Sequence, residues 1–238
     1  MRSGVLNAGV WNTRSAARPA EREVSPRVER VQPIAGWSRE KFAVEQIRGL
    51  VSRLFSPSVT PPLRQVVFSS VEPETDVQNI CRRVGEVLAA ESPRDVAVVI
   101  AALPWLPGEL SQSPRNDEGK RAPAPRELGI QVRGNLWSLP LATDKDEART
   151  AYLHRYLGEI RREFEYSIIA APSCGESNQP FATAQFSDGL VLVLSAQHTR
   201  RVAALKIRNA LEGARVRLLG TVLTDREFPI PEGIYRRL

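Results

Sequence analysis

The chain has 238 residues, of which 42% are hydrophobic, with a formal net charge of +6 and a pI of about 9.8. This composition supports a full hydrophobic core and excludes a wholly disordered protein, and the length suits one large α/β domain or two small ones. The basic balance permits contact with nucleic acid or an anionic membrane surface, but demonstrates neither.

The predicted elements begin after an N-terminal stretch without periodicity. Residues 1–36 are rich in Arg, Ala, Ser, Pro and Glu, which predicts a disordered tail. Apolar spacing then predicts a helix over 38–55, which three prolines end. Beyond it, strand patterns alternate with helix patterns; the strands are expected at 65–69, 95–102, 135–139, 166–171, 189–195 and 216–223. Helices are expected at 76–90, 146–163 and 199–212, with a weaker pattern at 178–186.

Several of these strands are apolar at every position, as in 96–100 and 190–194. Strands that are buried on both faces have this composition. Their alternation with helices predicts a single α/β domain over 37–238, a doubly wound and mostly parallel sheet with helices on both faces. A segment rich in Pro, Gly and charge, about 104–134, is predicted to be a flexible excursion.

The turn between the strand at 65–69 and the helix at 76–90 has an unusual composition. In nucleotide-binding α/β proteins this turn carries a Gly-rich loop that surrounds phosphate and a Lys that meets its charge. Here it has neither Gly nor Lys, and it contains Glu72, Glu74 and Asp76. We expect Asp76 to cap the helix and the three carboxylates to oppose phosphate binding.

Six stretches in order resemble one family together, the cytoplasmic ATPase-like domain of bacterial tyrosine kinases of capsule and exopolysaccharide synthesis. This family belongs to a wider group of deviant P-loop ATPases that includes chromosome-partitioning and Min-type proteins. The stretches are 42–48, 65–73, 135–140, 163–172, 188–194 and 219–226. The resemblance implies a P-loop NTPase-like fold with nucleotide at the carboxyl edge of the sheet.

The chain departs from the family at each nucleotide-site motif. In the degenerate loop, which includes Thr75 and Asn79, Val77 takes the place of the family's Lys, and Gln78 takes that of its magnesium-binding hydroxyl. The family's metal-site carboxylates are replaced by apolar residues, namely Ile100, Ala102 and Ala170. Phosphoryl transfer depends on the charge neutralisation that these groups supply. We therefore predict no catalytic residues, no bound metal, and no ATP or magnesium as cofactor.

Other reactive groups have weak sequence support. The two cysteines, Cys81 and Cys174, match no metal-binding spacing and suit a reducing cytoplasm. The two histidines, His154 and His198, are expected to be surface or loop residues, and Thr199 is expected to cap the helix that follows His198. The loop 173–177 follows a buried strand, where a nucleophile can sit, but no Ser/His/acid or Cys/His spacing supports one.

Three arginines are candidates for partner contacts. Arg48 lies in the first helix, which the family uses for assembly, and Arg200 and Arg201 stand at the start of a helix, where positive charge is unfavourable. No signal peptide is recognisable, and the longest apolar run, 96–106, is too short to span a bilayer. We expect a cytoplasmic protein, with a peripheral position at the inner face of the membrane as a further possibility.

The leading hypothesis is a catalytically inactive relative of the exopolysaccharide tyrosine kinases. It would regulate or scaffold polysaccharide biosynthesis and export through a membrane protein of polysaccharide assembly or a related kinase, with homo-oligomers as another option. Two alternatives remain open. One is a nucleotide-binding switch or active ATPase with a site rebuilt from Thr75, Gln78 and Asn79. The other is a partitioning-type nucleic-acid-associated protein, which lacks a recognisable readout module.

Overall fold

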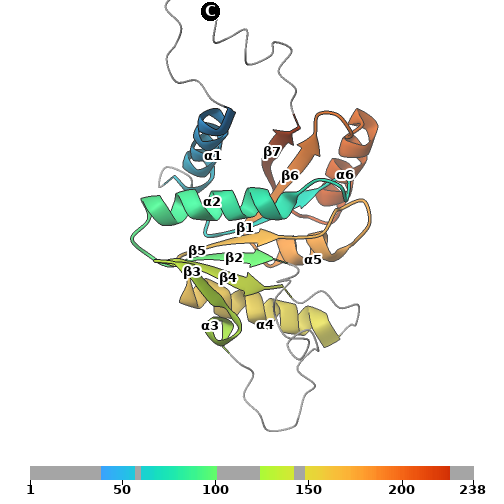
Figure 1. The fold of residues 1–238 in the computed structure, drawn as a ribbon. Coiled ribbons are helices and arrows are strands. Elements are labelled where there is room, and N and C mark those ends of the chain that lie inside the picture. The colour runs from blue at the N-terminus through green and yellow to red at the C-terminus, as the bar shows by residue number, and fades with distance from the viewer. Residues whose placement is uncertain (1–38, 57–59, 101–123, 142–147, 226–238) are drawn as a thin grey trace, which may run out of the picture. The chain divides into compact units, whose positions relative to one another are not determined.

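The computed structural model describes residues 39–56, 60–100, 124–141 and 148–225, all within one compact unit. A seven-stranded sheet has the order β3-β4-β2-β5-β1-β6-β7, and every neighbouring pair is parallel except β3 and β4 (Figure 1). This architecture confirms the predicted fold class. The strands are β1 Gln65–Ser70, β2 Val96–Ile100, β3 Ile130–Arg133, β4 Leu136–Pro140, β5 Tyr166–Ala170, β6 Gly189–Ser195 and β7 Leu218–Thr224.

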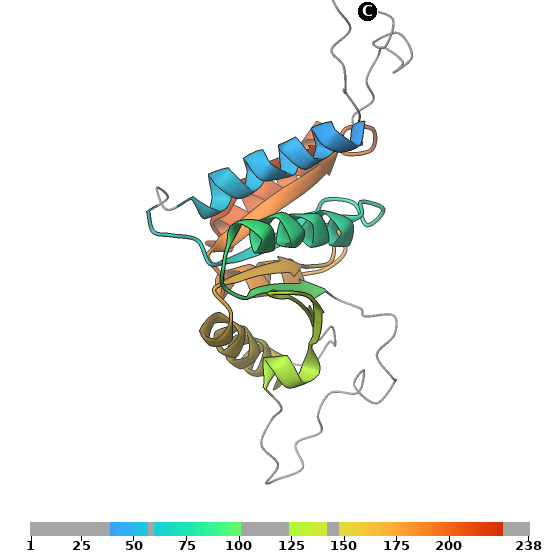
Figure 2. The same ribbon diagram turned by 60° about the vertical axis from the view of Figure 1, so that its left-hand side comes forward.

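Helices cover both faces of the sheet. Helices α1 and α2 lie on one face, and α3, α4, α5 and α6 lie on the other (Figures 1 and 2). The helices are α1 Arg39–Phe55, α2 Val77–Glu91, α3 Pro125–Leu128, α4 Ala148–Glu163, α5 Gln179–Gln185 and α6 Arg201–Gly213. The weak helical pattern at 178–186 is therefore a real helix, α5. None of the helices in the described stretches is long and apolar enough to cross a membrane.

The core has two layers because successive strand residues point to opposite faces of the sheet. In β1 all six residues are buried: Val66 and Phe68 join the layer beneath α1 and α2, and Val67 joins the layer on the opposite face. This two-sided burial explains why the central strands lack the polar alternation of a half-exposed sheet.

The predicted excursion at about 104–134 is wrong in its last third. Residues 125–128 form α3, and 130–133 form β3, which pairs antiparallel with β4. The guanidinium of Arg126 lies 5.0 Å from the ring centroid of Trp137 and 4.9 Å from that of Phe164, and it forms an ion pair with Asp95. These contacts hold a segment whose composition is typical of a loop. Residues 101–123, like the predicted tail at 1–36, lie outside the described residues.

The parallel strands bring three loops to one edge of the sheet. The loops that follow β1, β5 and β6 all leave from its carboxyl edge, because these strands are neighbours and point the same way. In open α/β sheets, this edge is where ligands bind.

Candidate functional site

The loop after β1 leads into α2 through a side-chain cap. One carboxylate oxygen of Asp76 accepts a hydrogen bond from the backbone N–H of Asn79 at 3.0 Å, which confirms the predicted cap. A phosphate at a helix N-terminus would use such an N–H group. Next to the cap, the side chain of Val77 is 5% exposed and packs in the layer beneath α1 and α2. The position that we expect to match the family's Lys is therefore part of the hydrophobic core.

Glu72 ties this loop to the loop that follows β6. The hydroxyl of Thr199 donates to Oε2 of Glu72 at 2.5 Å, and the same hydroxyl accepts from the backbone N–H of Ser195 at 2.9 Å. Our expectation that Thr199 caps the next helix is wrong. Arg200 is the N-cap residue of α6 and makes no side-chain cap bond, because a guanidinium has no acceptor. The Thr199 hydroxyl is engaged with Glu72 and Ser195 instead.

The loop after β5 packs closely against the same region. The N–H of Cys174 donates to the carbonyl of Ser70 at 2.8 Å, and the hydroxyl of Ser69 donates to the carbonyl of Pro172 at 2.5 Å. At Gly175 the chain approaches so closely that an added Cβ would lie 2.5 Å from the carbonyl oxygen of Val71. The three loops therefore hold one another through direct contacts between protein groups.

The remaining residues of the degenerate loop make few contacts. Glu74 and Gln78 are exposed, and Thr75 is half-buried, with its carbonyl accepting from the N–H of Val77 at 2.9 Å. The side-chain oxygen of Asn79 accepts from Arg82 at 2.9 Å. The structure thus gathers the acids at the expected edge without converging them on one point.

Two of the positions that we expect to match the family's metal-site acids are apolar and lie close together. Ile100 and Ala170 stand side by side in register at the ends of β2 and β5, and both pack in the layer beneath α2. Ala102 lies outside the described residues. Within the described ranges, no group of three or more His, Cys, Asp and Glu residues could hold a metal ion.

The two groups with nucleophilic potential are unsuited to nucleophilic catalysis. Burial raises the pKa of the Cys174 thiol, and its contact with the Ser69 hydroxyl offsets this only in part, so the thiol stays protonated near neutral pH. The hydroxyl of Ser195 lies 3.1 Å from Nδ1 of His198, but Ser195 is only 2% exposed, and Glu72 is bonded to Thr199. Sequence reasoning missed this Ser–His pair, whose signal is a serine at a strand end three residues before a histidine.

A groove of about 480 Å³ runs beside the start of α2. Its floor is apolar, from Val98, Ile100 and Leu136, whereas Asp76 and Arg82 belong to the polar rim. Among the described residues that line the groove, Arg82 is the only cation, and it is already bonded to Asn79. A polyphosphate placed there would meet one cation and one carboxylate, which leaves its charge unneutralised.

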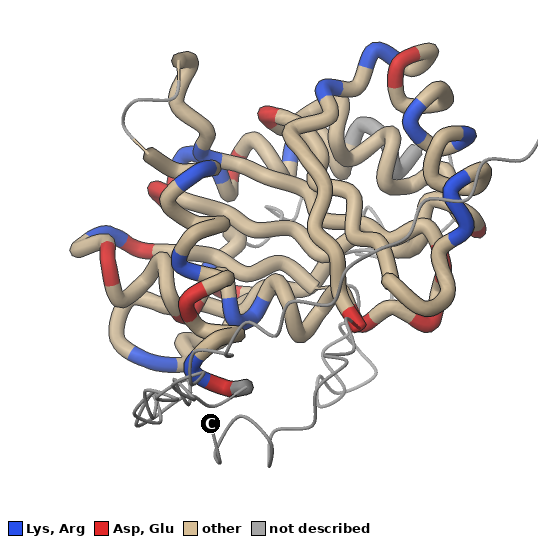
Figure 3. Tube along the Cα trace, turned by 90° about the horizontal axis from the view of Figure 1, so that it is seen from above, with Lys and Arg blue, Asp and Glu red and all other residues tan. Residues whose placement is uncertain are grey.

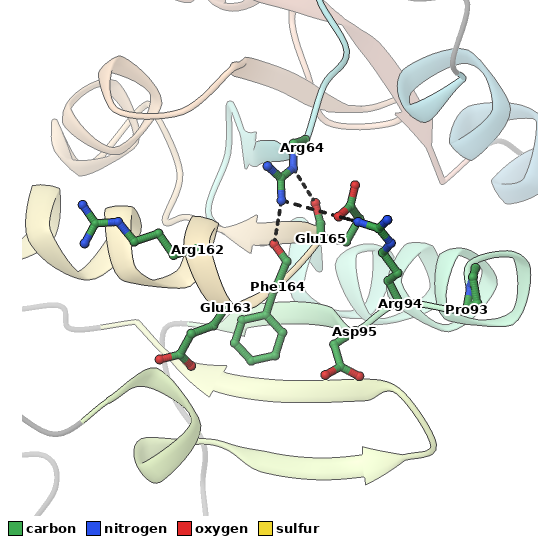
Figure 4. Close-up of a pocket in the computed structure, with 8 residues that line it drawn as sticks. All are labelled: Arg64, Pro93, Arg94, Asp95, Arg162, Glu163, Phe164 and Glu165. Atoms are coloured by element: carbon green, nitrogen blue, oxygen red, sulfur yellow. Dashed lines mark hydrogen bonds and ion pairs between the residues drawn. The ribbon is translucent and has the colours of Figure 1, made fainter.

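A second cavity, of about 390 Å³, lies at the opposite edge of the sheet, where β1, β2 and β5 begin. Figure 4 shows Arg64 and Arg94 directed toward Glu165, and their guanidinium nitrogens lie 3.6 and 2.8 Å from its carboxylate. The Arg64 side chain also donates to the carbonyls of Phe164 and Glu165. Arg64, Arg94 and Glu165 therefore satisfy one another, and this part of the cavity lining is an ion-pair network that joins loops.

The interaction candidates lie apart from these cavities. Arg48 is exposed on α1 and pairs with Glu45 of the same helix at 2.7 Å. Arg200 and Arg201 are exposed at the start of α6, as expected. His154 is exposed on α4, with its ring 4.7 Å from that of Phe186.

Comparison with known proteins supports the expected resemblance at the level of the fold. No protein-family model and no curated protein matches the sequence. Among solved structures, the kinase domain of Escherichia coli tyrosine kinase ETK is similar, with a TM-score of 0.60 and 13% identity over 80% of each chain. The VpsO kinase domain has a TM-score of 0.59 and 17% identity over 79% of this chain and 98% of that one. The MinD cell division protein of Aquifex aeolicus has a TM-score of 0.51 and 17% identity, covering 67% and 68%.

Proposed function

We propose that this protein is a catalytically inactive relative of the exopolysaccharide tyrosine kinases and acts as a regulatory or scaffolding partner in polysaccharide biosynthesis and export. Its fold resembles tyrosine kinase domains, and its sequence has lost the charged groups with which such a fold neutralises phosphate. A protein that keeps the architecture without the site can still present binding surfaces.

The bond between Glu72 and Thr199 carries the proposal. It fixes a carboxylate at the carboxyl edge of the sheet, beside the turn where a nucleotide's phosphates would lie. A carboxylate about 5 Å from one phosphate charge costs roughly 3 kcal/mol at an effective dielectric constant of about 20, which lowers affinity about a hundredfold. The core position of Val77 removes the compensating cation.

Isothermal titration of the full chain with magnesium-ATP tests the inactive site. We expect no heat of binding at micromolar nucleotide. Thermal unfolding is a second measurement, because a ligand at about one hundred times its Kd stabilises a protein by about 2.7 kcal/mol. An unchanged melting temperature in millimolar ATP agrees with the proposal; micromolar binding would overturn it and favour the rebuilt nucleotide switch.

The partner is tested by affinity capture from a membrane fraction of cells that make the polysaccharide. The expected result is recovery of a membrane protein of polysaccharide assembly or of a related kinase. Capture of neither would contradict the scaffolding part of the proposal. A mobility shift on DNA that weakens with salt would instead support the nucleic-acid alternative.

A further inference from the structure

Helix α6 and the turn after it form the most cationic surface of the described chain. Residues 200–217 hold one carboxylate, Glu212, and six cations: Arg200, Arg201, Lys206, Arg208, Arg215 and Arg217. Figure 3 shows the blue segments that follow one another along this helix and turn. None of the six side chains forms an ion pair with a described residue, whereas Arg64, Arg94, Arg126 and Arg161 all do.

The outward face of α6 mixes these cations with apolar side chains. Ile207 and Leu211 point into the core, so the opposite face of the helix points outward. On that face Val202 is 78% exposed and Leu205 is 38% exposed. Arg201, Leu205 and Arg208 follow one another at helical spacing, with Lys206 on the other side of Val202. We call this set of five residues the α6 basic face.

Fold stability does not explain this arrangement. Cations in the first turn of a helix oppose its dipole. The N-terminus of α6 carries Arg200 and Arg201 without a side-chain cap, and Val202 keeps most of its apolar surface in water. Cations at an uncapped helix start and an exposed apolar side chain both lower the stability of the fold, and such a surface is typical of a binding site for an anionic partner.

The apolar centre of the face discriminates between anionic partners. A nucleic-acid backbone is met by cations and hydrogen-bond donors, for which Val202 and Leu205 offer nothing. An acidic peptide that binds a helix needs a groove, whereas this face is the convex outer side of a single helix. An anionic bilayer offers headgroup phosphates to the cations and an acyl boundary to the apolar side chains, which is how interfacial helices bind.

We propose that the α6 basic face docks on the anionic phospholipid headgroups of a membrane, with Val202 and Leu205 at the acyl boundary. This inference goes beyond the proposed function, because it concerns a surface formed by α6 and holds whether or not nucleotide binds.

Co-sedimentation of the full chain with vesicles tests this proposal. The vesicles contain either phosphatidylcholine alone or about two parts phosphatidylcholine to one part phosphatidylglycerol. The test variant is R201Q/R208Q. The matched control, R83Q/R133Q, removes the same charge from two exposed arginines that make no ion pair with described residues. All four positions are exposed, so both variants should fold, and circular dichroism verifies it.

The native chain should bind the anionic vesicles more tightly than the neutral ones, and less tightly as salt is added. Each cation near such a surface contributes about 1 kcal/mol, so R201Q/R208Q should bind about 25-fold more weakly. The control should stay within about twofold of the native chain, and Val202→Ser should weaken binding about fivefold. Equal losses in both double variants, equal binding to both vesicle types, no vesicle binding at all, or α6-dependent binding to duplex DNA or polyglutamate instead of vesicles would each overturn the proposal.

Discussion

The hydrogen bond from Thr199 to Glu72 gives the sharpest prediction about the site. The substitution Thr199→Val keeps the shape of the side chain and removes its hydroxyl. That hydroxyl joins two groups, since it donates to the Glu72 carboxylate and accepts from the N–H of Ser195. The substitution therefore cuts the link between two loops and leaves a backbone donor of a buried residue without its partner.

The expected cost follows from these two losses. A hydrogen bond to a charged group contributes about 1.5–3 kcal/mol, and a buried donor left unsatisfied costs about 1–3 kcal/mol. Glu72 is half-buried, so water replaces part of the first contribution. We therefore expect Thr199→Val to lower the free energy of unfolding by about 2–3 kcal/mol, measured by urea denaturation. Thr199→Ser retains the hydroxyl and should cost less than about 1 kcal/mol.

A double-mutant cycle with Glu72→Gln separates the two losses. The amide oxygen of Gln still accepts a hydrogen bond but carries no charge, so the coupling between positions 72 and 199 should be about 1 kcal/mol. A cost for Thr199→Val that equals the cost of Thr199→Ser, or a coupling of zero, would refute the reasoning.

Three further predictions concern the fold around the site. Gly85→Ala in α2 should destabilise by about 1 kcal/mol despite alanine's better helix propensity, because its Cβ would lie 2.3 Å from Cγ2 of Val98; Gly49→Ala in α1 meets nothing within 4 Å and should stabilise by about 1 kcal/mol. Urea denaturation of both variants measures their free energies of unfolding, and a change in the same direction in both would contradict the prediction. Asp76→Ala should cost about 1 kcal/mol through loss of the α2 cap, and Asp76→Asn should restore most of it. Burial, with a smaller contribution from the Asp76 charge, raises the pKa of the Cys81 thiol, so above about pH 9 the unfolded state loses a proton that the folded state keeps. Stability should then fall with rising pH by about 1.4 kcal/mol per unit more steeply than in Cys81→Ala, and equal slopes in the two proteins would contradict this.

The elements that were predicted correctly have local signals. The apolar strands and the Asp76 cap depend on residues close together in sequence, and burial on both faces leaves a pattern in a single strand. The segment 124–134 was misjudged because Arg126 is held by Asp95 and Phe164, which are both more than 30 positions away. Composition alone cannot register such contacts.

At the candidate site, the proposed replacement of the family's Lys and metal-site acids is readable from the sequence residue by residue. The hydrogen bond between Glu72 and Thr199 cannot be predicted from the sequence, because the two residues are 127 positions apart. Thr199 also has a good local signal for a different role, that of a helix cap. The hydroxyl donates its one proton to Glu72 and accepts from the N–H of Ser195 rather than from an N–H group of α6.

The polar groups at this edge bear on the proposed loss of nucleotide binding. In a nucleotide-binding protein, the ligand supplies hydrogen bonds and charge that hold the loops, and its absence lowers stability. Here the chain supplies replacements from its own sequence: Asp76 takes an amide at the start of α2, and Glu72 takes the hydroxyl of the loop after β6. The close approach at Gly175 fixes the third loop. These contacts hold the carboxyl edge together without ligand. The carboxylates that we expect to repel phosphate also hold the scaffold together, so neutralising them should weaken the fold.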